Sequence, residues 1–287
     1  MRANTPFSFE VYPPRKPELQ AELQATIQKL AETGPEYITV TYGANGSSRD
    51  SSLECVSYIR QNTAIDPLAH LTCVGSTRDE AEALVRQFYG AGIRSFLALR
   101  GDAPEGTAPG EDFLGELKTA ADMVALIRSV SPYARIAVAA FPNGHPDSTR
   151  ENQDIEALLA KQAAGADFAI TQLFFHADDY LSFVERARAA GVTIPITPGI
   201  MPVTTANRLA RIVEITGLDT PRELTDALAA ASSKEEQRAV GIKHAVDLTN
   251  AVLDGGAPGI HLYAFNEHET VLEVLRQVGV IDTAAIG

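Results

Sequence analysis

The sequence predicts an α/β protein built as a single (β/α)8 TIM barrel. Eight short apolar segments, several of them β-branched, are each followed by a stretch with apolar residues at helical spacing. Strands that are apolar on both faces are typical of parallel sheets covered by helices. No change of composition and no low-complexity linker divides the chain, so we expect one domain over residues 1–287.

The expected strands and helices alternate from one end of the chain to the other. The strands are 7–12, 37–41, 67–73, 95–99, 134–140, 168–171, 194–197 and 260–264. The helices are 17–32, 49–61, 78–89, 117–130, 151–164, 178–190, 206–216, 234–254 and 269–278. A further helical segment, 221–231, is expected as an insertion before the eighth strand, and Pro198-Gly199 as a turn.

A doubly wound open sheet is the alternative architecture. The first strand is not followed by the glycine-rich G-x-G-x-x-G turn of dinucleotide-binding sheets, which disfavours it. The stretch 103–115, rich in glycine, proline and acidic residues, follows the fourth strand. It is a candidate binding loop or lid.

Charge and cysteine content limit the classes of partner. With 24 Lys+Arg against 37 Asp+Glu, the net charge of −13 disfavours nucleic acid and an anionic membrane as main partners. Bound anions must then be held by local cations or helix N-termini. Cys55 and Cys73 form no CxxC motif, which argues against structural zinc and fits a reducing compartment. Without a signal core or an apolar run of ~18 residues, we expect a cytoplasmic protein.

Polar residues stand at the ends of most expected strands, and in a barrel these ends meet at one mouth. The residues are Glu10, Thr41, His70, Asp102, His145, Gln172 and Asn266. Each also has a structural alternative. Asp102 could cap a turn, His70 could be a satisfied core histidine, and Glu10 could pair with Arg15. Their repetition favours a site over seven unrelated structural roles.

These residue types allow only some kinds of chemistry. A carboxyl in an apolar wall, such as Glu10, can act as a general acid, whereas one beside Arg100, such as Asp102, would stay ionised. There is no nucleophile elbow, no lysine at a strand end and no spacing of ligands for a metal ion. We therefore expect no bound metal. A proton donor without these groups indicates an organic cofactor that carries the difficult step.

Seven motifs, in the same order, resemble the signatures of the methylenetetrahydrofolate reductase family. They are FEVYPPR (9–15), VTYGAN (40–45), HLTC (70–73), ALRGD (98–102), GHP (144–146), ITQLFF (170–175) and PGI (198–200). The resemblance implies a flavin-bearing barrel that reduces 5,10-methylenetetrahydrofolate to 5-methyltetrahydrofolate. It implies FAD as cofactor, NAD(P)H as reductant, ping-pong hydride transfer and a homo-oligomer.

The resemblance also assigns roles to individual residues. Glu10 would be the catalytic acid that assists opening of the folate ring to a methylene-iminium ion, and Asp102 the carboxylate that stabilises this cation. The implied cofactor-binding positions are Thr41, Tyr42, Ala44, His70, Arg100, Gly101, Asp102, Ala120, Phe141, His145, Asp154 and Lys161. The implied substrate-binding positions are Asp102, Gln172, Arg208 and Glu267.

The chain departs from the family pattern where the folate tail is expected. Glu267 stands in place of a folate-contacting arginine, and Arg208, in place of a glutamine, could restore the positive charge. Phe141 replaces a common flavin-side tyrosine. Glu267 keeps two alternatives open: a divergent member that binds flavin or folate without this activity, and a reductase of another pterin or one-carbon substrate.

Overall fold

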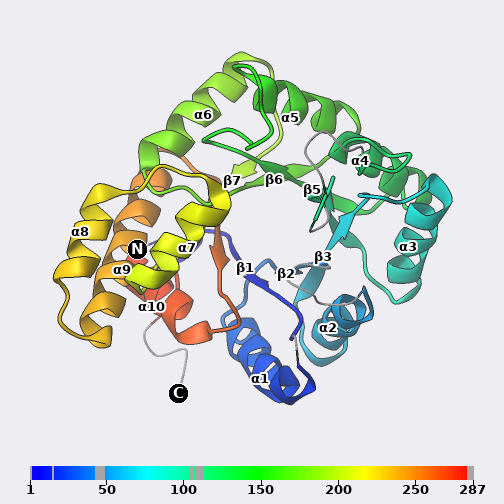
Figure 1. Ribbon diagram of the computed structural model, residues 1–287. Helices are drawn as coiled ribbons and strands as arrows, with labels where there is room; N and C mark the ends of the chain where they lie inside the picture. Colours follow the sequence, from blue (N-terminus) through cyan, green and yellow to red (C-terminus); the bar gives the residue numbers. More distant parts are fainter. Residues whose placement is uncertain (1, 15, 43–48, 104–105, 108–112, 283–287) are drawn as a thin grey trace.

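The computed structural model is a barrel of parallel strands enclosed by helices (Figure 1). It describes residues 2–14, 16–42, 49–103, 106–107 and 113–282. Every strand pairs in parallel with its neighbours, in the order β7-β6-β5-β4-β3-β2-β1-β9-β8. The predicted barrel class is therefore confirmed.

The elements lie close to their expected positions. The strands are β1 (Phe7–Val11), β2 (Tyr37–Val40), β3 (Asp66–Thr72), β4 (Ser95–Leu99), β5 (Arg135–Ala140), β6 (Phe168–Thr171), β7 (Ile196–Thr197), β8 (Gly199–Ile200) and β9 (Ile260–Tyr263). The helices are η1 (Pro17–Leu19), α1 (Gln20–Ala31), α2 (Arg49–Asn62), α3 (Arg78–Gly90), α4 (Ala120–Val130), α5 (Gln153–Ala163), α6 (Ala177–Ala189), α7 (Ala206–Thr216), α8 (Arg222–Ala230), α9 (Lys234–Asp254) and α10 (His268–Val278). Among the described helices, none combines the length and hydrophobicity needed to cross a membrane.

The barrel closes through a seventh strand that Pro198 divides into β7 and β8. The expected turn at Pro198-Gly199 is wrong, because β8 pairs with β9. Proline has no amide hydrogen for a strand ladder, but its carbonyl accepts a hydrogen bond from the His261 amide at 2.9 Å. The Gly199 amide donates to the Thr171 hydroxyl, and the Tyr263 hydroxyl donates to the Thr171 carbonyl, both at 2.8 Å. Side chains thus complete the closure.

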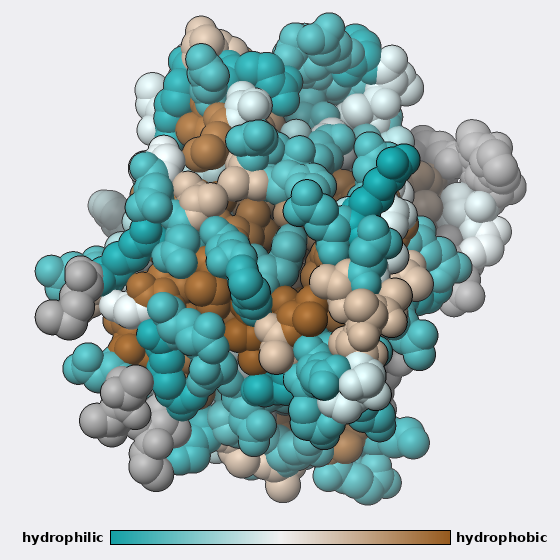
Figure 2. Space-filling model, turned by 90° about the vertical axis from the view of Figure 1, so that its left-hand side faces the viewer, coloured by the Kyte–Doolittle hydropathy of each residue, from teal (hydrophilic) through white to brown (hydrophobic). Residues whose placement is uncertain are grey.

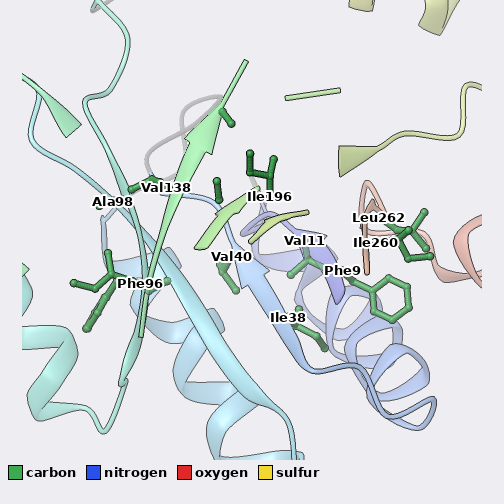
Figure 3. Close-up of a cluster of buried hydrophobic side chains, with 14 of the residues drawn as sticks. Phe9, Val11, Ile38, Val40, Phe96, Ala98, Val138, Ile196, Ile260 and Leu262 are labelled. Carbon is green, nitrogen blue, oxygen red and sulfur yellow. The ribbon is translucent and has the colours of Figure 1, made fainter. Parts of the chain in front are cut away.

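Side chains of the strands alternate between the helices and the barrel interior. Phe9 and Val11 of β1 pack in the core between strands and helices (Figure 3). Ser8 and Glu10, at the intervening positions, therefore face the interior. Part of that interior is a separate apolar cluster, formed by Tyr37, Leu68, Leu97, Ala137, Phe168 and Ile170. Nearer the carboxyl ends of the strands the inward side chains become polar.

Helices α7 and α8 pack on a second apolar cluster beyond the barrel. Its buried members are Leu173, Phe175, Val203, Leu209, Ile212, Leu224 and Leu228. This cluster ties α7 to the segment that follows β6, so the first turn of α7 lies at the mouth. Figure 2 shows this side of the molecule, where apolar residues gather between hydrophilic ones near the centre.

We expect Gly199→Ala to destabilise the protein because the barrel seam leaves no room for a side chain. A Cβ at Gly199 would lie 2.3 Å from the Thr171 carbonyl oxygen and 2.8 Å from the Tyr263 hydroxyl. Overpacking of this kind costs about 1–3 kcal/mol, measurable by urea unfolding. Gly90→Ala is the control, since a Cβ added there would meet no atom within 4 Å, and it should cause no loss. Equal stability of the two variants would contradict a close-packed seam.

Candidate active site

The Glu10 carboxylate lies inside the barrel between two histidine rings. Its Oε2 is 3.5 Å from His70 Nε2 and 3.8 Å from His261 Nε2. The same oxygen accepts a hydrogen bond from the Thr39 hydroxyl at 3.4 Å. The side chains of His70 and His261 are 7% and 0% exposed, whereas that of Glu10 is 21% exposed. Of these three ionisable groups, solvent therefore reaches the carboxyl most readily.

The surroundings of Glu10 favour its ionised form, and this corrects the expectation of an apolar wall. Burial raises the pKa of Glu10, but the neighbouring His261 and His70, together with the Thr39 hydroxyl, outweigh it, so the pKa lies below its ordinary value. Burial lowers the pKa of His70 to about 4, against the opposing attraction of Glu10. At neutral pH, a carboxylate thus faces a neutral His70.

His261 and its partner Ser8 are site residues that the sequence analysis missed. The Ser8 hydroxyl lies 2.8 Å from His261 Nδ1, and both residues are buried. They are opposite each other in the parallel β1–β9 pair. The only available signal was a polar residue between apolar ones, Phe7 and Phe9 in one strand and Ile260 and Leu262 in the other.

A second polar group lies beyond the ends of β4 and β5. Arg100 Nη2 is 2.8 Å from Asp147 Oδ2. The His145 ring packs edge-on against Phe141, with 4.6 Å between centroids, and its Nδ1 accepts a hydrogen bond from the Asp147 amide. Asp154 accepts a hydrogen bond from the His145 amide at 3.1 Å. The structure thus brings together several residues implied for the cofactor.

Lys161 adds a second cation to this group. Its Nζ donates to the Ala139 carbonyl at 2.8 Å and lies 5.9 Å from the Phe141 ring centroid. Burial lowers the pKa of Lys161 to about 8, against the opposing attraction of Asp154. Lys161 and Arg100 act on each other electrostatically, so positive charge is concentrated here in an acidic protein.

The other residues implied for the cofactor differ in how far they are engaged. Thr41 Oγ1 is buried and has no hydrogen-bond partner among the described residues. Tyr42 packs edge-to-face on Phe88, with 6.3 Å between ring centroids. Ala120 is the buried first residue of α4, which starts three residues later than expected because Thr119 caps it. Ala44, like the proposed Glu10 partner Arg15, lies outside the described residues.

Gly101 and Asp102 follow directly after the Arg100 position. Gly101 has a φ of +94°, and a Cβ there would lie 2.7 Å from the Val74 side chain, so glycine is required at this turn. Asp102 is exposed, and its charge acts on the pKa of His145. No hydrogen bond or ion pair joins it to Glu10 within the described part of the chain.

The positions implied for folate have different local roles. Gln172 is exposed, and its Oε1 accepts a hydrogen bond from the Leu173 amide at 2.9 Å. The exposed Arg208, in the first turn of α7, places its guanidinium carbon 4.9 Å from the Phe265 ring centroid. Glu267 caps α10 by accepting from the Thr270 amide at 3.2 Å, so its negative charge stabilises a helix N-terminus.

Asn266 holds the Phe265 segment against the end of β1. Its side chain accepts from the Tyr12 amide at 2.9 Å and donates to the Tyr12 carbonyl at 2.8 Å. Phe265 and Asn266 have φ values of 51° and 59°, a left-handed conformation that is uncommon outside glycine. The two-way side-chain bond fixes the turn that presents Phe265 to Arg208.

Among the described residues, no group of three or more His, Cys, Asp or Glu side chains could hold a metal ion. The mouth offers carboxyl groups, imidazoles and cations. A carboxyl group such as that of Glu10 can donate or accept a proton, and the Arg100–Lys161 group is suited to an anion.

Comparison with known proteins gives a family for this chain. A family model described as methylenetetrahydrofolate reductase matches residues 1–279. The 5,10-methylenetetrahydrofolate reductase of Salmonella typhimurium is 34% identical over 274 residues, which cover 95% of this chain and 90% of that protein. Methylenetetrahydrofolate reductase (NADH) 1 of Arabidopsis thaliana is 33% identical over 296 residues, which cover 99% of this chain and 50% of the plant protein.

A solved structure shares the fold at lower sequence identity. A Clostridium thermocellum protein, which binds two copies of 5-methyl-5,6,7,8-tetrahydrofolic acid, has a TM-score of 0.67 and 15% identity. The match covers 96% of this chain and 95% of that one.

We expect the free energy of unfolding of His70→Gln to fall less than that of the wild type as the pH is lowered from 7 to 4. The pKa of His70 is about 4 in the folded chain against 6.5 ordinarily, so between these values the unfolded chain binds more protons. The stability from a neutral His70 is complete above about pH 6.5 and is lost as the pH falls towards 4, by about 3 kcal/mol in all. Urea unfolding between pH 4 and 7 measures the slope. His176→Gln, an exposed control, should keep the wild-type slope; a His70→Gln slope equal to it would contradict the assignment.

Proposed function

This chain belongs to the methylenetetrahydrofolate reductase family, and from that premise we propose that it reduces 5,10-methylenetetrahydrofolate to 5-methyltetrahydrofolate with FAD and NAD(P)H. The observation that carries the proposal is a single carboxylate, Glu10, placed in the barrel between His70 and His261 with its Oε2 held from three strands. Family membership also leads us to expect a cytoplasmic homo-oligomer.

The residues around the mouth fit a flavin. Thr41 Oγ1, buried and without a partner among the described residues, is suited to a polar atom of a ligand, because buried hydroxyls are rarely left without a hydrogen bond. Arg100 and Lys161 supply the cations that phosphates need in a protein of net charge −13. Tyr42, Ala44, His70, Gly101, Asp102, Ala120, Phe141, His145 and Asp154 would complete the binding surface. When bound, the flavin would carry hydride between nicotinamide and folate.

Glu10 would protonate the folate nitrogen that leaves when the five-membered ring opens. Breaking this C–N bond produces a methylene-iminium ion and requires a proton on the departing nitrogen. Because Glu10 is surrounded by donors, it must take up this proton as the substrate docks and excludes water from the carboxyl, which favours the neutral form. The exposed Asp102 would then stabilise the cation.

The same mouth would admit the two substrates in turn, as ping-pong transfer requires. Gln172, exposed at the end of β6, would contact both folate and nicotinamide. Arg208, stacked on Phe265 at the rim, would receive the anionic tail of the folate. Glu267 caps the N-terminus of α10. This structural role accounts for a glutamate at this position without a loss of folate reduction. A divergent binding role and another pterin substrate remain as outcomes of the test.

The first experiment is the visible spectrum and steady-state kinetics of the purified protein. Flavin bands near ~450 nm are expected, together with oxidation of NADH or NADPH when methylenetetrahydrofolate or menadione is the acceptor. A colourless protein inactive with both acceptors would overturn the proposal. A flavoprotein that reduces menadione but not the folate would favour the divergent role or another substrate.

We expect Glu10→Gln to abolish folate reduction while leaving menadione reduction by NAD(P)H within about twofold. Loss of a positioned general acid lowers the rate by about 10²–10⁴-fold, and transfer from nicotinamide does not need this proton. Both half-reactions are followed with the same enzyme. Glu36→Gln removes a partly exposed acid that faces Arg135 at the other end of the strands and should change neither rate. Folate reduction by Glu10→Gln at the wild-type rate would exclude Glu10 as the acid.

We expect Arg208→Ala to raise the KM for methylenetetrahydrofolate with little change in kcat. One charge-assisted contact to an anionic tail contributes about 1.5 kcal/mol, or roughly tenfold in KM. Arg211→Ala is the matched control, because Arg211 lies on the same helix but pairs with Glu214 at 2.7 Å. If both variants keep the wild-type KM, Arg208 does not bind the tail.

A further inference from the structure

The barrel interior contains a polar chain that leads from Ser8 through His261 to Glu10. Ser8 Oγ lies 2.8 Å from His261 Nδ1, and His261 Nε2 faces Glu10 Oε2 at 3.8 Å. Ser8 is 1% exposed and His261 is fully buried, so water does not compete for these contacts. Ser8 and Glu10 lie on β1, and His261 lies opposite Ser8 on β9. Two neighbouring strands therefore fix the whole arrangement.

The Glu10 carboxylate and the Ser8 hydroxyl together favour one position for the hydrogen of a neutral His261. A neutral imidazole has one N–H donor and one acceptor nitrogen. If Nδ1 carried the hydrogen, the bare Nε2 lone pair would face a carboxylate oxygen, which is repulsive. With the Ser8 hydroxyl donating to Nδ1, the hydrogen lies on Nε2 and points at Glu10. Only this tautomer gives both nitrogens a favourable neighbour.

The hydrogen bond and the ion pairs that join the Glu10 carboxylate to the described residues all fall on one of its two oxygens. Oε2 is approached by Thr39 from β2, by His70 from β3 and by His261 from β9. No hydrogen bond or ion pair joins Oε1 to any described residue. Tyr263, the other ionisable group near Glu10 on β9, commits its hydroxyl to the Thr171 carbonyl. The carboxylate thus has one held oxygen and one oxygen left for substrate.

We propose that His261, with the Ser8 hydroxyl at its Nδ1, is a positioning residue that holds Glu10 Oε2 and leaves Oε1 as the oxygen that exchanges the proton with the substrate. The inference rests on the proposed function of Glu10 as the acid. His261 itself would touch neither substrate nor cofactor. Its donor also stabilises the carboxylate, so losing it should make Glu10 hold its proton to higher pH.

The test compares two substitutions that place an amide at different ends of the imidazole. The side-chain nitrogen of His261→Gln can occupy the place of Nε2 and still donate to Glu10, whereas that of His261→Asn reaches only the place of Nδ1. We expect the alkaline limb of folate reduction to move up by about one pH unit in His261→Asn. Its maximal kcat should fall by about tenfold or more. His261→Gln should restore both, and menadione reduction should be unchanged in each variant.

A second readout does not depend on activity. The full-length protein labelled with [¹³C]glutamate is titrated by NMR, and the Glu10 carboxyl signal is identified by its absence from Glu10→Gln. Its midpoint should rise in His261→Asn and return towards wild type in His261→Gln. Ser8→Ala, which removes only a hydroxyl, should move it in the same direction and serves if His261→Asn does not fold.

The outcomes separate this inference from the proposed function. The positioning role would be overturned if His261→Asn and Ser8→Ala both kept the wild-type alkaline limb of folate reduction and the wild-type midpoint of the Glu10 titration. It would also be overturned if His261→Asn and His261→Gln lost activity equally. If the wild-type protein does not reduce methylenetetrahydrofolate, the proposed function fails, while the NMR titration still decides whether His261 holds Glu10.

Discussion

A carboxylate inside a barrel is unfavourable unless donors surround it, and the placement of Glu10 therefore depends on its neighbours. These come from three strands: Thr39 from β2, His70 from β3 and His261 from β9. β9 in turn is fixed by β8, because the His261 amide donates to the Pro198 carbonyl. The same residue, His261, thus takes part in the closure of the barrel through its amide and in the electrostatics of Glu10 through its ring. The donor opposite Ser8 lies on a strand that is paired with β1 on one side and with β8 on the other.

Local periodicity predicted most of the fold, because each strand and helix is specified by residues close in sequence. It failed at Pro198, because a Pro-Gly pair is typical of a turn and the two strands that meet there have only two residues each. It also failed at His261, whose contacts with Ser8 and Glu10 span about 250 residues. A single histidine in an apolar strand carries no spacing signal, so its partner appears only when the strands are adjacent in space.

Charged residues at the mouth show that motif position and physical role can differ. Glu267 stands where an arginine was expected, yet it satisfies the Thr270 amide at the start of α10. Arg100, implied for phosphate, is engaged by Asp147 at 2.8 Å. An anion that binds Arg100 must therefore compete with a carboxylate of the protein itself. Such competition favours ligands that offer more than one phosphate oxygen, since bidentate pairing with a guanidinium is the stronger contact.

The division of the seventh strand has a local consequence for the seam of the cylinder. Backbone ladders set a fixed spacing between neighbouring strands, but at Pro198 the connection to β6 passes through the hydroxyls of Thr171 and Tyr263. Backbone pairing still holds β7 to β6 and β8 to β9, so these two side chains add to the ladders at the point where the strand is divided. An exchange at Thr171 or Tyr263 would therefore act on the seam locally, beside backbone pairs that remain in place.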